Sequence, residues 1–327
     1  MGAKPLFKTP KPLPAALSRL RLPVIGAPLF IVSNPQLVIA QCKAGIVGSF
    51  PALNARPQSQ LDEWIHEITE ALAEHDRAYP DAPCAPFAVN QIVHRSNDRF
   101  EADMATCAKW KVPIVITSLG AREELNHAVH SWGGITLHDI IDDRFARKAI
   151  DKGADGLIAV AAGAGGHAGK WSPFALIQEI RRWFDGPLIL SGAIATGRAV
   201  LAAQAMGADL AYIGSPFIAT PEARASEEYK QGIVAGGAAD IVNSALFTGI
   251  PGNYLRASIE AAGMDPDNLP PPGPEAMNFE SASGAKAWRD IWGSGQGIGA
   301  IDAVVPAGEL VERMAREYAE ARAALCG

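Results

Sequence analysis

The chain has 327 residues, of which 48% are apolar and 20% charged, and its formal net charge at pH 7 is −6. This length suits one large α/β barrel with an insertion better than a small single core. The acidic balance gives no indication of a nucleic-acid or membrane partner, and the longest apolar runs are strand-sized, too short for a membrane-spanning helix.

The first residues contain no apolar signal-peptide segment, and the four cysteines have no metal-binding spacing. We therefore expect a cytoplasmic protein with reduced thiols and no bound metal.

Short apolar segments alternate with longer amphipathic ones from residue 23 to residue 214. We expect strands at 23–28, 45–50, 86–92, 112–118, 134–138, 156–161, 187–192 and 210–214. We expect helices between them at 34–43, 58–79, 95–109, 122–131, 140–152, 173–184 and 197–206. Eight such units predict a (β/α)8 TIM barrel, because the alternative, an open doubly wound sheet, explains an unchanged pattern over eight units less well.

The pattern changes after residue 214. Residues 222–300 contain helix-like pieces at 223–234 and 254–262 and turns rich in proline and glycine, and no strand is evident there. We interpret 222–300 as a helical insertion after strand eight that covers the mouth of the barrel. Residues 1–221 and 301–327 then form the barrel itself, with 307–325 as its last helix.

A histidine stands in a run of glycine and alanine directly after the sixth expected strand. The run is Ala161-Ala-Gly-Ala-Gly-Gly-His-Ala-Gly169. Glycines such as Gly165 and Gly166 let the backbone approach a flat or charged ligand closely, and an imidazole exchanges protons near neutral pH. The pattern indicates a ligand-facing rim with His167 as its acid/base residue, although a glycine-rich turn with an incidental histidine fits it too.

Small residues end the seventh and eighth expected strands. Ser191-Gly192-Ala193 and Gly214-Ser215 offer backbone N–H groups with little obstruction, together with two hydroxyl groups. A phosphate site recurs at these two loops in TIM barrels, near helix N-termini that favour an anion. The segments therefore predict a phosphate site, with two merely tight turns as the alternative. Because no Gly-x-Gly-x-x-Gly follows the first strand, the phosphate does not belong to a Rossmann dinucleotide.

Three polar residues stand where expected strands end. Asn90 ends the third strand, and a buried amide there needs partners, which either a flavin ring edge or a neighbouring loop would supply. His138 ends the fifth strand and either contacts a ligand or bonds to backbone. Asp139 beside it either orients His138 or caps the next helix.

One turn of the insertion is unusual in composition. Trp288 and Trp292 share a helix face, which usually means packing, and a Gly-Ser-Gly-Gln-Gly turn follows them. We expect Gln296 in this turn to reach a ligand.

These segments resemble the nitronate monooxygenase family, formerly called 2-nitropropane dioxygenases, which are FMN-dependent TIM barrels. The matching segments run nearly end to end: Pro23-Val-Ile-Gly-Ala-Pro28, Ala44-Gly-Ile-Val-Gly48, Pro86-Phe-Ala-Val-Asn90, Gly163-Ala-Gly-Gly-His-Ala-Gly169, Leu190-Ser-Gly-Ala193, Gly207-Ala-Asp209, Ile213-Gly-Ser-Pro-Phe217 and Trp292-Gly-Ser-Gly-Gln296. The Gly-Gly-His-x-Gly element is the most specific of them.

The resemblance implies that FMN is the cofactor and that His167 is the active-site histidine. It implies an FMN phosphate site at Gly192, Ala193, Gly214 and Ser215, and an isoalloxazine ring lined by Ala27, Pro28, Leu29 and Asn90. With the residue patterns above, the expected cofactor contacts also include His138, Gly165, Gly166, Ser191 and Gln296.

The implied activity is oxidation of alkyl nitronates by dioxygen to a carbonyl compound and nitrite. The partners are then a small-molecule substrate and dioxygen, and the oligomeric state stays open, with a homodimer as one option. Two departures concern the substrate: Leu29-Phe30 replaces a methionine of many relatives, and Asp139 stands where some quinone-reducing relatives carry lysine.

Two alternative functions remain open. The same fold and histidine loop occur in FMN-dependent enoyl-ACP reductases, which makes NAD(P)H-dependent reduction of quinones or enoyl thioesters the first alternative. A flavin-free barrel lyase or isomerase that acts on a phosphorylated metabolite would use the same phosphate loops, although no lysine or metal-carboxylate cluster is evident at the strand ends.

Overall fold

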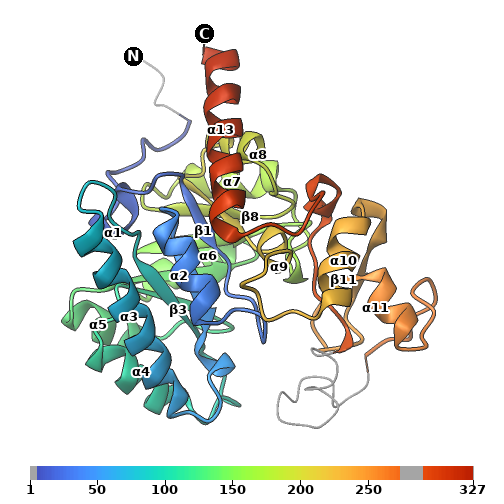
Figure 1. Cartoon of the computed structure of the whole chain (residues 1–327), viewed down its shortest axis with the longest axis horizontal. Helices are drawn as coiled ribbons and strands as arrows, with labels where there is room; N and C mark the ends of the chain where they lie inside the picture. Colours follow the sequence, from blue (N-terminus) through green and yellow to red (C-terminus); the bar gives the residue numbers. More distant parts are fainter. Residues whose placement is uncertain (1–5, 273–289, 327) are drawn as a thin grey trace.

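Parallel strands form a closed ring at the centre of the fold. The structure, a computed structural model, describes residues 6–272 and 290–326 (Figure 1). Eight strands of this part of the chain form the sheet, in the order β1-β9-β8-β6-β5-β4-β3-β2. A parallel bridge between Ile25 and Val47 closes the ring between its two ends. The bounds are β1 (Val24–Gly26), β2 (Gly48–Pro51), β3 (Phe87–Ile92), β4 (Ile114–Ser118), β5 (Ile135–Ile140), β6 (Gly156–Val160), β8 (Leu188–Ser191) and β9 (Leu210–Ile213).

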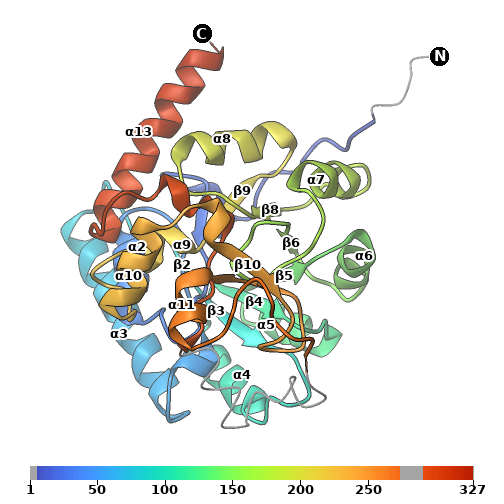
Figure 2. The same ribbon diagram turned by 90° about the vertical axis from the view of Figure 1, so that its right-hand side faces the viewer.

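Helices surround this ring, as Figure 2 shows in a view along the strands. They are α2 (Pro35–Lys43), α3 (Gln60–Ala78), α4 (Phe100–Lys109), α5 (Glu123–Ser131), α6 (Asp143–Asp151), α7 (Pro173–Arg181), α8 (Gly197–Met206) and α13 (Ala307–Cys326). The side chains of Asn34, Asp142 and Thr196 each accept a hydrogen bond from the backbone amide of the third residue of α2, α6 and α8, respectively. These caps fix where the three helices begin. The predicted (β/α)8 barrel is confirmed.

Apolar side chains from seven of the eight strands, and from Val47 just before β2, fill the inside of the ring. The buried members of this group are Leu17, Ile25, Val47, Ala88, Ile114, Ile116, Leu137, Ile158, Ile189, Leu210 and Tyr212. Leu17 belongs to the short helix α1 (Ala15–Ser18), so the N-terminal segment packs into one end of the ring. Because successive strand residues point to opposite faces, this group tells which residues face the interior of the barrel.

The expectation that no strand lies in 222–300 is wrong. Besides α10 (Glu227–Ala235) and α11 (Arg256–Ala261), this segment contains β10 (Ile241–Ser244) and β11 (Gly252–Leu255). They form an antiparallel sheet with β7 (Gly166–His167), the last part of the glycine-rich run. Both strands are four residues long, and β7, the second partner of β11, lies far back in the chain. Local periodicity in the sequence therefore gives little signal for either strand. In Figure 2, α10, β10 and α11 lie in front of the end of the barrel.

The remaining described elements are short: α9 (Ser215–Ile218) follows β9, and three 3-10 turns occur at η1 (Ala52–Asn54), η2 (Ala238–Asp240) and η3 (Gln296–Ala300). Trp288 lies outside the described residues, whereas Trp292 stacks on Tyr229 with ring centroids 4.9 Å apart. Over 6–272 and 290–326, no helix is both long and apolar enough to cross a bilayer.

Gly197 allows α8 and α13 to pack closely. A Cβ on Gly197 would overlap the carbonyl oxygen of Met314, and the Gly197 amide donates to Glu317 Oε2 at 2.7 Å. We expect Gly197→Ala to lower the free energy of unfolding by about 1–3 kcal/mol, because α13 must move away. Gly308→Ala, at an exposed α13 position with open space around it, should be neutral or slightly stabilising. Thermal unfolding of both variants checks this, and equal melting temperatures would contradict it.

Candidate functional site

The candidate site lies at the C-terminal end of the barrel strands, where enzymes of this fold carry their chemistry. There the interior lining changes from apolar to polar. Asn90, Ser118 and Asp139 continue the inward-facing rows of β3, β4 and β5, two positions beyond Ala88, Ile116 and Leu137.

Asn90, Ser118 and Asp139 form one hydrogen-bonded row across three strands. Asn90 is buried, and its Nδ2 donates to Ser118 Oγ at 2.8 Å. Ser118 Oγ in turn donates to Asp139 Oδ2 at 2.6 Å. Burial raises the pKa of Asp139 to about 7, although the Ser118 bond opposes this rise. Asp139 Oδ1 is inaccessible to solvent and has no hydrogen-bond partner within residues 6–272 and 290–326.

The structure does not bring His138 to this end of the barrel interior. His138 alternates with the inward-facing Leu137 and Asp139, so its ring faces the helix layer, where Nδ1 lies 2.5 Å from Thr117 Oγ1. Burial lowers the pKa of His138 to about 4. Asp139 does not cap the next helix, since Asp142 does so. We therefore leave His138 out of the ligand-facing set and place Asp139 in it.

The glycine-rich run makes contact with two other loops of the site. The Gly163 carbonyl accepts hydrogen bonds from the amides of Ala193 (3.2 Å) and Gln296 (2.9 Å). A Cβ on Gly165 would lie 2.8 Å from the Gly295 amide nitrogen, so only glycine permits this approach. Three of the predicted site segments therefore meet at Gly163 and Gly165.

The loops that follow β8 and β9 lie against the same segments. Gly192 and Ala193 have positive φ angles of 142° and 54°. Ser215 Oγ accepts a hydrogen bond from the Gly295 amide at 2.9 Å. Gly214 lies beside the first-strand loop, because a Cβ on it would be 3.1 Å from Leu29 and 3.6 Å from Ala27.

His167 is held by the insertion. As part of β7 it pairs with Gly252 of β11, and its Nε2 lies 2.8 Å from Thr248 Oγ1. Thr248 Oγ1 also lies 3.1 Å from the Ile250 carbonyl; if its single hydrogen is donated there, Thr248 accepts from His167 and the imidazole hydrogen lies on Nε2. Burial lowers the pKa of His167 to about 4, which makes the ring neutral at pH 7. Thr248 gave no signal in the sequence.

Asn54 supports the loop that contains Ala27, Pro28 and Leu29. Its Oδ1 accepts from the Ile31 amide at 2.8 Å, and its Nδ2 donates to the carbonyls of Leu29 (2.9 Å) and Ser33 (2.8 Å). Ile31 has a φ of 58°, a conformation that a β-branched residue rarely adopts, and these bonds hold it there. Sequence reasoning missed Asn54.

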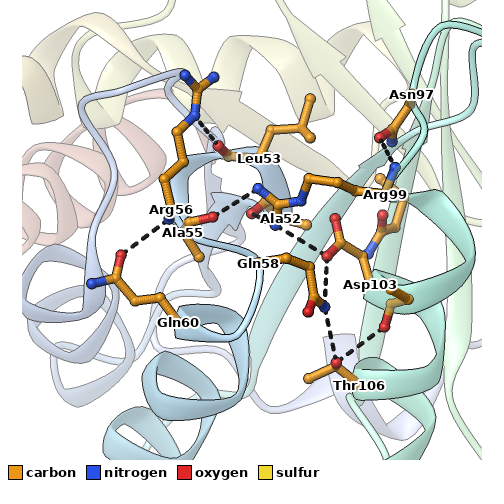
Figure 3. Close-up of polar contacts among 12 residues, drawn as sticks. Ala52, Leu53, Ala55, Arg56, Gln58, Gln60, Asn97, Arg99, Asp103 and Thr106 are labelled. Carbon is orange, nitrogen blue, oxygen red and sulfur yellow. Dashed lines mark hydrogen bonds and ion pairs between the residues drawn. The ribbon is translucent and has the colours of Figure 1, made fainter.

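A buried ion pair in turn anchors the turn that carries Asn54 (Figure 3). Arg99 Nη1 donates to the Ala55 carbonyl at 2.8 Å, and Arg99 Nη2 donates to Asp103 Oδ1 at 3.1 Å. Gln58 Nε2 donates to the same Asp103 oxygen at 3.2 Å. Burial raises the pKa of Asp103, and Arg99 opposes this rise. This cluster connects α4 to the β2–α3 turn and so supports the site from outside.

A histidine and a hydrogen-bonded row of polar side chains at the C-terminal end of a (β/α)8 barrel are typical of an enzyme of this fold class. The chain belongs to the nitronate monooxygenase family, whose profile matches residues 11–317. It is 27% identical to a nitronate monooxygenase of Paraburkholderia phytofirmans, over 90% of this chain and 92% of that one. The protein is therefore an oxidoreductase.

Two solved structures are similar over almost the whole chain. Nitroalkane oxidase from Streptomyces ansochromogenes superposes with a TM-score of 0.80 at 26% identity, covering 95% of this chain and all of that one. FabK from Thermotoga maritima superposes with a TM-score of 0.78 at 25% identity, covering 95% and 97% of the two chains.

Replacement of Thr248 by valine tests how His167 is held. Thr248→Val keeps the shape but removes the acceptor of the Nε2 hydrogen in a buried place, so we expect a loss of about 1–3 kcal/mol in unfolding free energy. Thr248→Ser keeps the hydroxyl and should lose less than half of that. Urea unfolding measures both, and a valine variant as stable as the serine variant would exclude this bond.

The neutral state of His138 predicts an acid-sensitive fold. Its pKa is 6.5 in the unfolded chain and about 4 in the folded protein, so the stability that it contributes is complete above pH 6.5 and is lost as pH falls toward 4. The full loss amounts to about 3 kcal/mol. In urea unfolding between pH 7 and pH 4, His138→Gln should show a shallower decline than the wild type. Parallel declines would contradict the assignment.

Proposed function

We propose that the protein binds FMN at the barrel mouth and oxidises alkyl nitronates, or the nitroalkanes that yield them, with dioxygen. The observation that carries the proposal is His167, a neutral imidazole fixed at the end of the barrel by Thr248 in a chain of this family. Membership in this family weighs against a flavin-free lyase or isomerase.

The residues at the barrel mouth fit a flavin mononucleotide. At Gly192 and Gly214 a Cβ would approach the Ala162 carbonyl at 2.8 Å and Leu29 at 3.1 Å, so glycine lets these two loops pack closely against their neighbours. Asp139 and Tyr212 bring buried polar atoms without partners to the interior of the barrel. The proposed contacts are Ala27, Pro28, Leu29, Asn90, Gly165, Gly166, Ser191, Gly192, Ala193, Gly214, Ser215 and Gln296. FMN, when bound there, supplies an electron acceptor that dioxygen can reoxidise.

His167 acts in this proposal as a base. With its hydrogen on Nε2, the basic lone pair lies on Nδ1, and a neutral ring can take the α-proton of a nitroalkane. Thr248 keeps the ring in this tautomer and orientation. A positioned base of this kind typically contributes about 10²–10⁴-fold to a rate.

The decisive variant is His167→Asn. We expect it to bind FMN like the wild type and to lose about 10²–10⁴-fold in turnover of a nitroalkane, because the base is gone while the loop geometry is kept. Absorption spectra report the bound FMN, and nitrite release reports turnover. His127→Asn, an exposed change on α5, is the matched control and should retain full activity. Wild-type turnover by His167→Asn would exclude the catalytic role.

The second candidate is NAD(P)H-dependent reduction of a quinone or an enoyl thioester. The likeness to FabK, at 25% identity, is as strong as the likeness to nitroalkane oxidase, at 26%. Anaerobic NADH added to the FMN-loaded protein separates the two candidates. Rapid loss of the visible flavin absorbance supports the reductase, and an unchanged spectrum supports nitronate oxidation.

A further inference from the structure

The barrel mouth contains a carboxyl oxygen whose lack of a partner is unexplained by the fold. Asp139 Oδ2 is bonded to Ser118, whereas Oδ1 is shielded from solvent and has no partner among the described residues. A buried polar atom left in this way costs about 1–3 kcal/mol. Such atoms in native structures indicate a missing ligand or a functional role.

The position of Asp139 identifies the direction from which a ligand would come. Asp139 follows Leu137 on the inward-facing row of β5, at the C-terminal end of the strand. Tyr212 of β9, three strands from β5 around the ring, is a second interior residue whose polar atom has no partner among the described residues.

In the row of Asn90, Ser118 and Asp139, each hydrogen is donated in the direction of Asp139. Asn90 donates to Ser118, and Ser118 uses its single hydrogen for Asp139 Oδ2. Asn90 is a proposed flavin contact, and the row connects it through Ser118 to Asp139 on β5.

We propose that Asp139 is a flavin-contacting residue that donates a hydrogen bond from Oδ1 to an acceptor on the pyrimidine edge of the bound ring. This inference rests on the proposed function, because it requires FMN at the barrel mouth. It adds Asp139 to the ligand contacts and assigns the carboxyl the role of a neutral donor.

The surroundings of Asp139 favour the neutral acid. Over the described residues, no lysine or arginine forms an ion pair with Asp139. A buried carboxylate without a cation is costly, and burial raises the pKa of Asp139 to about 7. A protonated Oδ1 has a hydrogen to give, and the acceptors of a flavin pyrimidine ring are its carbonyl oxygens and N1.

Apoprotein titrated with FMN tests the inference by affinity and by the reduction potential of the bound flavin. Asp139→Ala removes the donor, and we expect FMN to bind about tenfold more weakly and the bound flavin to become harder to reduce. Asp139→Asn keeps an N–H donor in nearly the same place and should stay within about twofold of the wild type. Asp151→Asn, an exposed change on α6, is the matched control and should behave like the wild type.

Two results would overturn the inference while leaving the proposed function intact. Wild-type affinity and potential in Asp139→Ala would exclude contact with the flavin. FMN binding that becomes much tighter in Asp139→Asn would mean that Asp139 is ionised and repels the ring. FMN binding by no variant, the wild type included, would instead reject the proposed function.

If Asp139→Ala does not fold, Ser118→Ala provides a second test of the inference. This variant leaves Asp139 in place but removes the bond that orients it, so we expect about threefold weaker FMN binding. Unchanged FMN affinity and flavin reduction potential in a folded Ser118→Ala protein would show that the Ser118 bond does not position Asp139 for contact with the flavin.

Discussion

The site depends on the attachment of the glycine-rich run to the insertion. A run of glycine and alanine has high conformational entropy, and ordering it is costly. The Gly163 carbonyl accepts two amide hydrogens, one from the β8 loop and one from Gln296, while β7 pairs with β11. These bonds hold His167 in one place, although nothing in its own sequence neighbourhood would do so. The insertion is therefore part of the framework of the candidate site.

The two residues at the end of β5 show how strand register decides chemistry. His138 and Asp139 are neighbours in the chain, but they face opposite sides of the barrel wall. His138 bonds to Thr117 against the helix layer, and Asp139 joins Ser118 and Asn90 on the interior side. A shift of one residue would exchange the two groups. Burial then shifts the two pKa values in opposite directions, since it lowers the pKa of His138 and raises the pKa of Asp139.

The barrel could be predicted from the sequence because its signal is local. Each strand is a short apolar run, and each helix has a periodic pattern between turn residues, so all eight units are readable one at a time. The loops of the candidate site could be proposed for the same reason, because their glycines stand directly at strand ends. Asn54, Thr248 and the Arg99–Asp103 pair were not found, since each acts through contacts between distant segments. β10 and β11 were missed because a four-residue strand is defined by its partner.

The central claim is that this barrel mouth is a flavin site whose polar contacts are already in place in the protein. The most direct measurement is titration of FMN fluorescence with the purified apoprotein. We expect quenching that saturates at one FMN per chain and a shift of the visible absorption bands on binding. FMN fluorescence and absorption that stay unchanged at excess protein would contradict this account of the site.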